Sequence, residues 1–331
     1  MTPTPAIPAP GRSLWGEAWQ RLKARRGIRF CLWILVIYTA AAFFGEAVYW
    51  RSRNRDEGPS YQRINMNEAY QRPSVVSHPF ARARAELGPA AAWTTVAGEG
   101  CRHLFQHPMG TDNLGRDVLQ RLTQGARIAF QVGVITSLIA IPIGVILGCL
   151  AGYLGGRTDD VIVWLYSTVA SMPGLLFILA ISMVVGKGLK GVYLGIGLMT
   201  WTSLCRLIRA EVMKHKERPY VLAARTLGAG PVRIMFRHIL PNVFHIVIIA
   251  FSLRFPSAIG TEVFMSFLGI GVQSEPSWGI MISNARLRLW HGMWWEMTFV
   301  TLAVFLVVLA FNLVGDALRD ALDPRLRAGK R

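Results

Sequence analysis

The sequence lacks several features that would mark an enzyme. It has no Gly-x-x-x-x-Gly-Lys-Ser/Thr loop, so no backbone cradle is present for the phosphates of ATP. Its histidines and carboxylates form no catalytic set, because His215 and His238 lie in a basic stretch and His245 lies at the edge of an apolar run. We therefore expect a protein that is not an enzyme and binds no cofactor directly.

Cysteine is also scarce, with four residues in a chain of 331. Their positions, 31, 101, 149 and 205, give no disulfide spacing. Cys101, His103 and His107 lie near one another in the sequence, but no fourth ligand accompanies them. The sequence therefore predicts no metal site.

Acidic residues are outnumbered, with 19 Asp and Glu against 36 Lys and Arg and a net charge of +17. Such an excess can serve nucleic-acid binding. Here, however, the basic residues flank apolar runs and form no stripe with interleaved aromatic residues. We therefore expect a lipid bilayer as partner and no nucleic acid.

Apolar residues are abundant, at 52% of the chain, which is too many for an ordinary soluble domain. They gather in runs long enough to cross a bilayer, so we predict an all-α integral membrane protein with six spans. The expected spans are residues 28–48, 129–152, 161–186, 192–208, 243–268 and 296–314. The second span has glycine at 144, 148, 152 and 156. Such a stripe lets a neighbouring helix approach closely.

These spans divide the chain into five parts. Residues 1–27 form an N-terminal tail, and span 28–48 is interpreted as an uncleaved anchor, because its charged leader and apolar run are both long for a signal peptide. Residues 49–127 form a polar segment ending in a helix that lies along the membrane surface. Residues 128–316 form the membrane core, and 317–331 a C-terminal tail.

Three residues stand out within the spans. Pro173 interrupts the third span, and Arg254 and Glu262 lie in the fifth. Charged side chains at membrane depth normally face a bundle interior or a wet pathway, and proline bends helices around cavities or at packing contacts. We predict that these residues line a solute pathway. A structural Arg–Glu pair and a simple packing kink are the alternatives.

The loop at 209–242, between the fourth and fifth spans, predicts two short helices that meet at a glycine corner. Pro219 suits the first turn of one helix and Gly228 the left-handed position after its end. Pro231 can open the second helix, which must stop before Pro241. The residues expected to contact a partner are Tyr220, Ala223, Ala224, Arg225, Leu227, Gly228 and Pro241. An amphipathic helix pair at the surface is the alternative interpretation.

A second patterned stretch precedes the second span. It contains Gly110-Thr111-Asp112 and Gly115-Arg116-Asp117. The side chain of Asp112 can cap an Asx-turn, and Asp117 can pair with Arg121 one helical turn further on.

The order Ala223-Ala224, three residues, Gly228 and then Ile239-Leu240-Pro241 resembles the coupling loop of permease subunits in binding-protein-dependent ABC importers. The family pattern begins with Glu, where this chain has Leu222. The two glycine-containing triplets, together with residues 266–279, resemble the C-type subunit of dipeptide and oligopeptide (peptide/nickel) permeases. The resemblance covers about residues 107–327.

This resemblance implies a type I importer fold with a cytoplasmic coupling-helix loop, in a permease subunit that carries peptides across a bacterial inner membrane. It implies a homologous second permease subunit, two ATPase subunits that bind ATP and Mg²⁺, and an extracytoplasmic solute-binding protein as partners. Nickel or another non-peptide solute stays open as the cargo. A secondary transporter is the alternative of a different class, but it predicts paired repeats with matching broken helices, and it leaves residues 219–242 unexplained.

The distribution of charge predicts the orientation. Residues 1–29, 153–160, 206–241 and 315–331 hold 20 of the 36 Lys and Arg but only 8 of the 19 Asp and Glu. Because basic residues concentrate on the cytoplasmic side of membrane proteins, both termini and the 209–242 loop are expected there.

Overall fold

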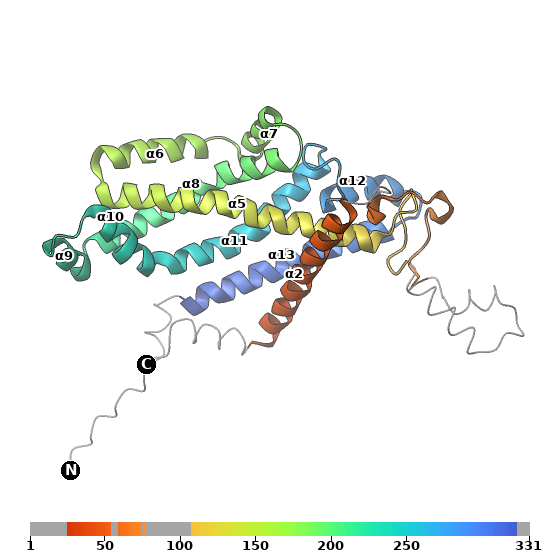
Figure 1. The fold of residues 1–331 in the computed structure, drawn as a ribbon, viewed down its shortest axis with the longest axis horizontal. Coiled ribbons are helices and arrows are strands. Elements are labelled where there is room, and N and C mark those ends of the chain that lie inside the picture. Colours follow the sequence, from red (N-terminus) through yellow and green to blue (C-terminus); the bar gives the residue numbers. More distant parts are fainter. Residues whose placement is uncertain (1–24, 54–58, 75, 77–106, 323–331) are drawn as a thin grey trace, which may run out of the picture.

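The computed structural model describes residues 25–53, 59–74, 76 and 107–322. Within these residues the chain is helical apart from its turns and one isolated bridge between Thr111 and Asp117 (Figure 1). Most of the predicted N-terminal tail, the residues Cys101 and His103, and the chain after residue 322 lie outside the described part.

Six regions of the described chain suit membrane spans. Five are single helices long and apolar enough to cross a bilayer, and one is a bent pair of helices. The five are α2 (Arg26–Arg53), α5 (Val118–Leu154), α8 (Leu189–Lys216), α11 (Leu240–Phe267) and α13 (Trp295–Leu322), and the pair is α6 (Gly156–Ala170) with α7 (Gly174–Val185). The prediction of an all-α protein with six span regions is confirmed in this form.

The second span and the helix predicted before it are one helix, α5, of 37 residues. At 1.5 Å per residue, α5 is about 55 Å long, well beyond the thickness of a hydrocarbon core. The separate surface helix expected at the end of residues 49–127 is therefore wrong. No proline separates residues 118–127 from the span, so the helix begun at Val118 continues into it.

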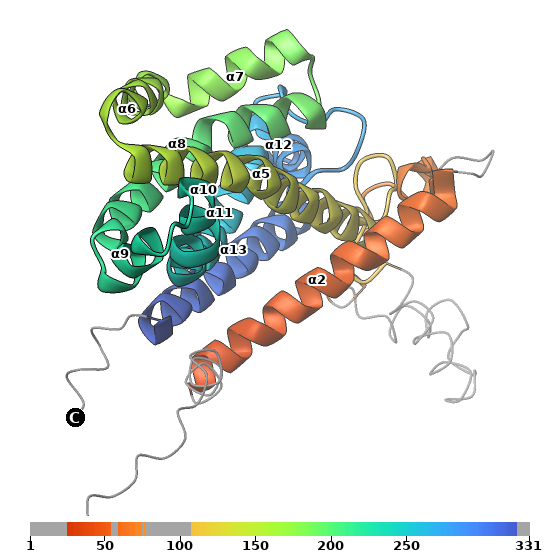
Figure 2. The same ribbon diagram turned by 60° about the vertical axis from the view of Figure 1, so that its left-hand side comes forward.

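The third span, expected over 161–186 with an interruption at Pro173, consists of two helices that meet at this proline. Helices α6 and α7 are bent by 90° relative to each other. The break falls at Ser171–Pro173, and Pro173 has extended backbone angles (φ −58°, ψ 120°) at the start of α7. Because proline cannot continue the hydrogen-bond ladder, the turn forms there, and α7 packs against α8 (Figure 2).

The glycine stripe of α5 forms a close contact with α8. A Cβ added to Gly148 would lie 2.8 Å from the carbonyl oxygen of Cys205, and one added to Gly152 would lie 2.7 Å from that of Arg209. The stripe therefore acts as predicted, except that Gly156 lies beyond it at the start of α6, with nothing within 4 Å of its Cβ position.

The bundle has two distinct ends, visible in Figures 1 and 2. At one end lie α9 (Pro219–Thr226), α10 (Pro231–Arg233), the start of α2 and the end of α13. Ile28 of α2 and Ala317 of α13 are buried in one cluster there. At the other end lie α12 (Trp278–Leu289) and the loop at 107–117. Two short 3₁₀ helices, η1 (Ser60–Gln62) and η2 (Met66–Glu68), precede that loop in the chain.

Helix α12 was not predicted from the sequence. The side chain of Ser277 caps it by accepting a hydrogen bond from the backbone N–H of Ile280 at 3.3 Å. The buried Trp278 donates its indole N–H to the carbonyl of Leu122 at 3.0 Å. This tryptophan holds α12 against α5.

Candidate functional sites

The first candidate site is the elbow, which we define as residues 219–241. Pro219 begins α9, Gly228 follows it in the left-handed conformation with φ +78°, and Pro231 begins α10. These three placements are as predicted. The glycine corner turns the chain back toward the bundle between the two helices.

The second helix of the elbow does not stop before Pro241, so that prediction is wrong. From α10 the chain passes through a π-helical turn, η3 (Ile234–Ile239), directly into α11. The backbone N–H of Leu240 donates to the carbonyl of Met235, five residues earlier. The wider turn accommodates Pro241 without breaking the helix. The elbow and the fifth span are consequently one continuous helical body.

The residues of α9 that were expected to contact a partner do not all lie on its outer face. Val221 and Ala224 point inward and are buried in a cluster with Tyr153 of α5 and Val212 of α8. Ala224 therefore packs α9 against the bundle and does not belong to its outer face. The exposed members of the predicted contact set are Tyr220, Ala223, Arg225, Leu227, Gly228 and Pro241.

Leu227 is the most exposed of these side chains, at 87%. Leu222, where the family pattern has Glu, is also exposed. The hydroxyl group of Tyr220 lies 2.8 Å from Nδ1 of His215, and burial raises the pKa of Tyr220. The guanidinium of Arg225 lies 5.8 Å from the ring centroid of Tyr153. The elbow thus offers exposed apolar side chains beside positive charge, on a base packed against α5 and α8.

The second candidate site lies around Arg254, near the middle of α11. Its Nη2 donates to the carbonyl of Thr200 and, at 2.8 Å, to the hydroxyl of Ser203 on α8. Glu262 lies two helical turns away, is 1% exposed and accepts from Ser266 Oγ at 2.6 Å. Arg254 and Glu262 form no ion pair, and Pro173 lies outside the cavity that Arg254 lines. The structure therefore does not bring the three predicted pathway residues together.

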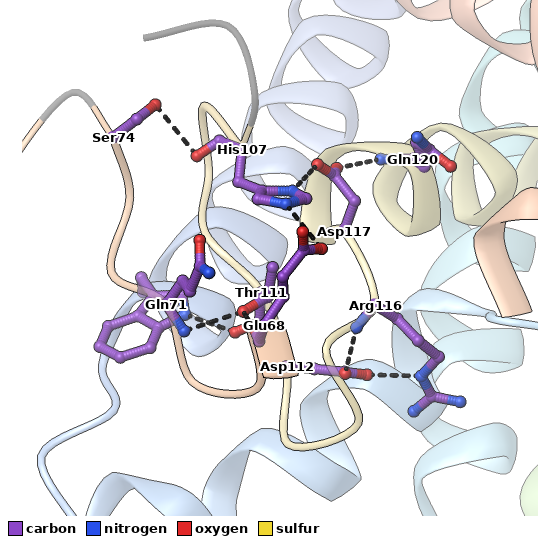
Figure 3. A network of polar contacts seen from close by, with 10 residues as sticks. Glu68, Gln71, Ser74, His107, Thr111, Asp112, Arg116, Asp117 and Gln120 are labelled. Atoms are coloured by element: carbon purple, nitrogen blue, oxygen red, sulfur yellow. Dashed lines mark hydrogen bonds and ion pairs between the residues drawn. The ribbon is translucent and has the colours of Figure 1, made fainter. Parts of the chain in front are cut away.

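The third candidate site is the clasp, which we define as residues 65–71 and 107–117 (Figure 3). Buried Asp112 accepts from the backbone N–H groups of Leu114 and Arg116 through one oxygen, at 2.8 and 2.9 Å, and from Nε of Arg116 through the other at 2.7 Å. The predicted Asx-turn is confirmed. The six motif residues, Gly110, Thr111, Asp112, Gly115, Arg116 and Asp117, all lie in this one loop.

The partner predicted for Asp117 is wrong. Nε of Arg121 lies 3.8 Å from Asp112, and Asp117 caps α5 by accepting from the backbone N–H of Gln120 at 3.0 Å. The other oxygen of Asp117 lies 2.8 Å from Nδ1 of His107. An N-cap position holds the carboxylate before the first helical turn, so Asp117 faces the loop.

Thr111 joins three segments of the chain. Its hydroxyl donates to the carbonyl of Glu68 at 2.5 Å and accepts from the backbone N–H of Gln71 at 2.9 Å. Its own carbonyl accepts the indole N–H of Trp295, the first residue of α13, at 3.0 Å. The clasp therefore fixes the starts of α5 and α13 against residues 65–71.

His107 lies between two carboxylates in the clasp. Besides Asp117, it contacts Glu68 through Nε2 at 3.3 Å. The hydrogen bond to Asp117 raises the pKa of His107, the negative charges of both carboxylates add to this, and burial opposes it. Among the described residues no cluster of three or more His, Cys, Asp or Glu could hold a metal ion. Glu68 carried no sequence signal, because it is brought to His107 across 39 positions by the loop.

The fold and these sites define a polytopic helical membrane protein with an exposed basic elbow at one end and a hydrogen-bonded clasp at the other. The sequence model of the binding-protein-dependent transport system inner membrane component matches residues 144–328. The chain belongs to this family. The model of the N-terminal membrane domain of oligopeptide transport permease C matches residues 13–73.

Similar curated proteins agree with this assignment. The dipeptide permease protein DppC of Bacillus subtilis is 40% identical over 67% of this chain and 69% of its own length. The glutathione permease protein GsiD of Pectobacterium atrosepticum is 32% identical over 96% of this chain and 93% of its own. Among solved structures, an inward-facing MetNI methionine ABC transporter matches 62% of this chain and 96% of its own, with 16% identity and a TM-score of 0.48.

Proposed function

We propose that the protein is the C-type permease subunit of an ATP-driven importer that carries di- or oligopeptides across the bacterial cytoplasmic membrane. The observation that carries the proposal is the similarity to dipeptide, oligopeptide and glutathione permease proteins, which reaches 96% of the chain for the last of these. The chain has no nucleotide-binding loop, so ATP and Mg²⁺ would bind to separate ATPase subunits.

The elbow is the surface proposed to contact an ATPase subunit. Its outer residues are exposed while Val221 and Ala224 hold it on the bundle. Because α10, the π-turn and α11 form one helical body, a displacement of the elbow would move the fifth span with it. ATP can change the bundle only if the elbow binds the two states of the ATPase differently.

The proposed complex contains three further kinds of component. A homologous second permease subunit would complete the pathway, two ATPase subunits would bind at the elbows, and an extracytoplasmic binding protein would deliver the cargo. The concentration of basic residues in the segments at the elbow end supports a cytoplasmic position for the elbow and both termini. The clasp would then face the binding protein.

Reconstitution tests this function directly. The chain is co-expressed with its second permease and ATPase subunits, purified, and placed in proteoliposomes with the loaded binding protein outside. We expect ATP-dependent accumulation of a labelled tripeptide and stimulation of ATP hydrolysis by the binding protein. Accumulation of Ni²⁺ in place of peptides would show that the cargo is nickel and not a peptide. Transport without ATPase subunits, driven by an ion gradient, would identify a secondary transporter and refute the proposal.

A further inference from the structure

Arg254 is a membrane-embedded cation whose partners in the described part of the chain are neutral. Nη2 is held by the Thr200 carbonyl and the Ser203 hydroxyl. Nη1 is buried and has no hydrogen-bond partner. None of the acidic side chains in the described residues lies within ion-pair distance of Arg254. A buried cation without a counter-charge is costly, and one with an unused donor more so.

The cavity beside Arg254 lies between α5, α8 and α11, near the middle of each helix. Its volume of about 30 Å³ holds about two water-sized groups. Six of its eight lining residues are polar, and five of these carry hydroxyl groups. The lining residues are Thr136, Ser137, Ile196, Thr200, Arg254, Ser257, Ala258 and Thr261.

Several of these hydroxyl groups donate a hydrogen bond to a backbone carbonyl of their own helix. Thr136 donates to the carbonyl of Val132 at 2.7 Å, Ser137 to that of Gly133 at 2.7 Å, and Thr261 to that of Ser257 at 2.9 Å. Their oxygen lone pairs can still accept hydrogen bonds. The cavity therefore combines a cation that needs an anion with hydroxyl oxygens that can accept N–H groups.

A peptide C-terminus carries the complementary chemistry. Its carboxylate matches a guanidinium, and its last amide N–H suits a hydroxyl oxygen. We propose that this cavity is a transient binding site in the membrane for the C-terminal carboxylate of the cargo, with Arg254 as the residue that pairs with it. The inference rests on the proposed function and narrows its substrate class to solutes with a free carboxylate.

The location of Arg254 connects this site to the elbow. Arg254 lies on α11, which continues from the elbow, whereas its anchors Thr200 and Ser203 lie on α8. Relative movement of the two helices would change the donors offered to the carboxylate. Binding and release of cargo would then follow the state of the ATPase. An acidic side chain of the second permease subunit is the other possible partner of Arg254, and the experiment below separates the two.

The test compares two forms of one tripeptide, with a free C-terminal carboxylate or a C-terminal amide. A pair that the purified binding protein binds equally well is chosen first, so that recognition outside the membrane does not contribute. Uptake of each form is measured in proteoliposomes that hold the complete importer, with the wild-type chain, Arg254→Gln or Arg254→Lys. Assembly of every variant is checked by co-purification of all subunits.

We expect Arg254→Gln to lower uptake of the carboxylate form about tenfold or more and that of the amide form by less than about twofold. Arg254→Lys keeps the positive charge, so its uptake of the carboxylate form should lie between that of the wild type and that of Arg254→Gln. Thr200→Val, within the cavity, should reduce uptake of the carboxylate form. Thr168→Val is the matched control, because the Thr168 hydroxyl also donates to its own helix, at the Trp164 carbonyl, but lies outside the cavity.

Three results would overturn the site. An equal fall for both cargo forms would identify Arg254 as a structural residue or as the partner of an acidic side chain in the second permease. Unchanged uptake in Arg254→Gln, or failure of both Arg254 variants to assemble, would also refute it. If the wild-type complex accumulates neither form, the proposed peptide function fails, and that result does not depend on any Arg254 variant.

Discussion

The clasp and the elbow are both built around a glycine in the left-handed conformation, yet the two glycines have opposite surroundings. Gly115 in the clasp has φ +70°, and a Cβ there would lie 1.8 Å from the backbone oxygen of Asn65. Gly228 in the elbow has φ +78° and nothing within 4 Å of its Cβ position. The clasp corner is closed against the chain itself, whereas the elbow corner is open.

The same contrast holds for the side chains around them. In the clasp, Thr111 and Asp112 are at most 2% exposed, and their polar atoms bind groups of the same chain. In the elbow, Leu227 projects almost fully exposed. One end of the bundle is thus stabilised internally, and the other presents a surface that another protein would complete.

The largest expected effect on stability is the difference between alanine substitutions at the two glycines. Gly115→Ala should lower the stability of the folded chain by about 4 kcal/mol, because backbone strain and overlap with Asn65 add together. Gly228→Ala should cost only about 1 kcal/mol, the strain alone. The midpoints of thermal unfolding in detergent compare them. Equal shifts would show that the clasp is no more tightly packed than the elbow.

The charge at the centre of the clasp should matter nearly as much. Asp112→Ala removes the acceptor of two backbone N–H groups and the carboxylate that lies within ion-pair distance of the buried Arg121, which should cost about 3 kcal/mol. Asp320→Ala is the control, because Asp320 forms an exposed pair with Arg25. Its unfolding midpoint should stay near that of the wild type. A similar loss in both variants would contradict the central place of Asp112.

In the elbow, function should suffer more than stability. Gly228→Val puts a β-branched residue at positive φ, so the corner should change shape at a cost of about 2 kcal/mol. We expect ATP-dependent uptake to fall about tenfold while the chain still inserts and assembles. Gly230→Val is the matched control, since Gly230 has φ −69° and open space around it. Normal uptake in Gly228→Val would argue against the role of the elbow.

The smallest expected effect is a pH dependence of stability that arises from His107 in the clasp. The pKa of His107 is raised above its ordinary value of 6.5, so its protonated form stabilises the folded state. That contribution is fully present below pH 6.5 and is lost as the pH rises through the raised pKa. The unfolding midpoint of the wild type should therefore fall relative to His107→Gln over this range. A constant difference between the two would show that the ring stays neutral.

The features that depend on local sequence patterns were predicted correctly. Apolar runs predicted the spans, and the Pro219 and Gly228 signals predicted the start and end of α9, because caps and corners are set by neighbouring residues. Asp112 was placed correctly in its Asx-turn for the same reason. The cytoplasmic orientation and the pathway role of Glu262 and Pro173 stay predictions.

Apart from the π-turn at Pro241, the failures share a different cause, because each depends on contacts outside its own stretch of sequence. A rule that ends a helix before proline could not foresee the π-turn at Pro241. The inward position of Ala224 depends on packing against Tyr153 and Val212. Helix α12 is fixed by Trp278 on a carbonyl of α5, 156 positions away. The partner of Asp117 was missed because His107 competes with Arg121 through the fold of the loop.

The central claim is that an ATPase subunit binds the elbow, and site-specific cross-linking tests it most directly. A photoreactive amino acid is placed in turn at Leu227 in the elbow and at Trp290, which is equally exposed beside α12 at the opposite end. We expect a cross-link to the ATPase subunit from position 227 and none from position 290. A cross-link from position 290, with none from 227, would contradict it.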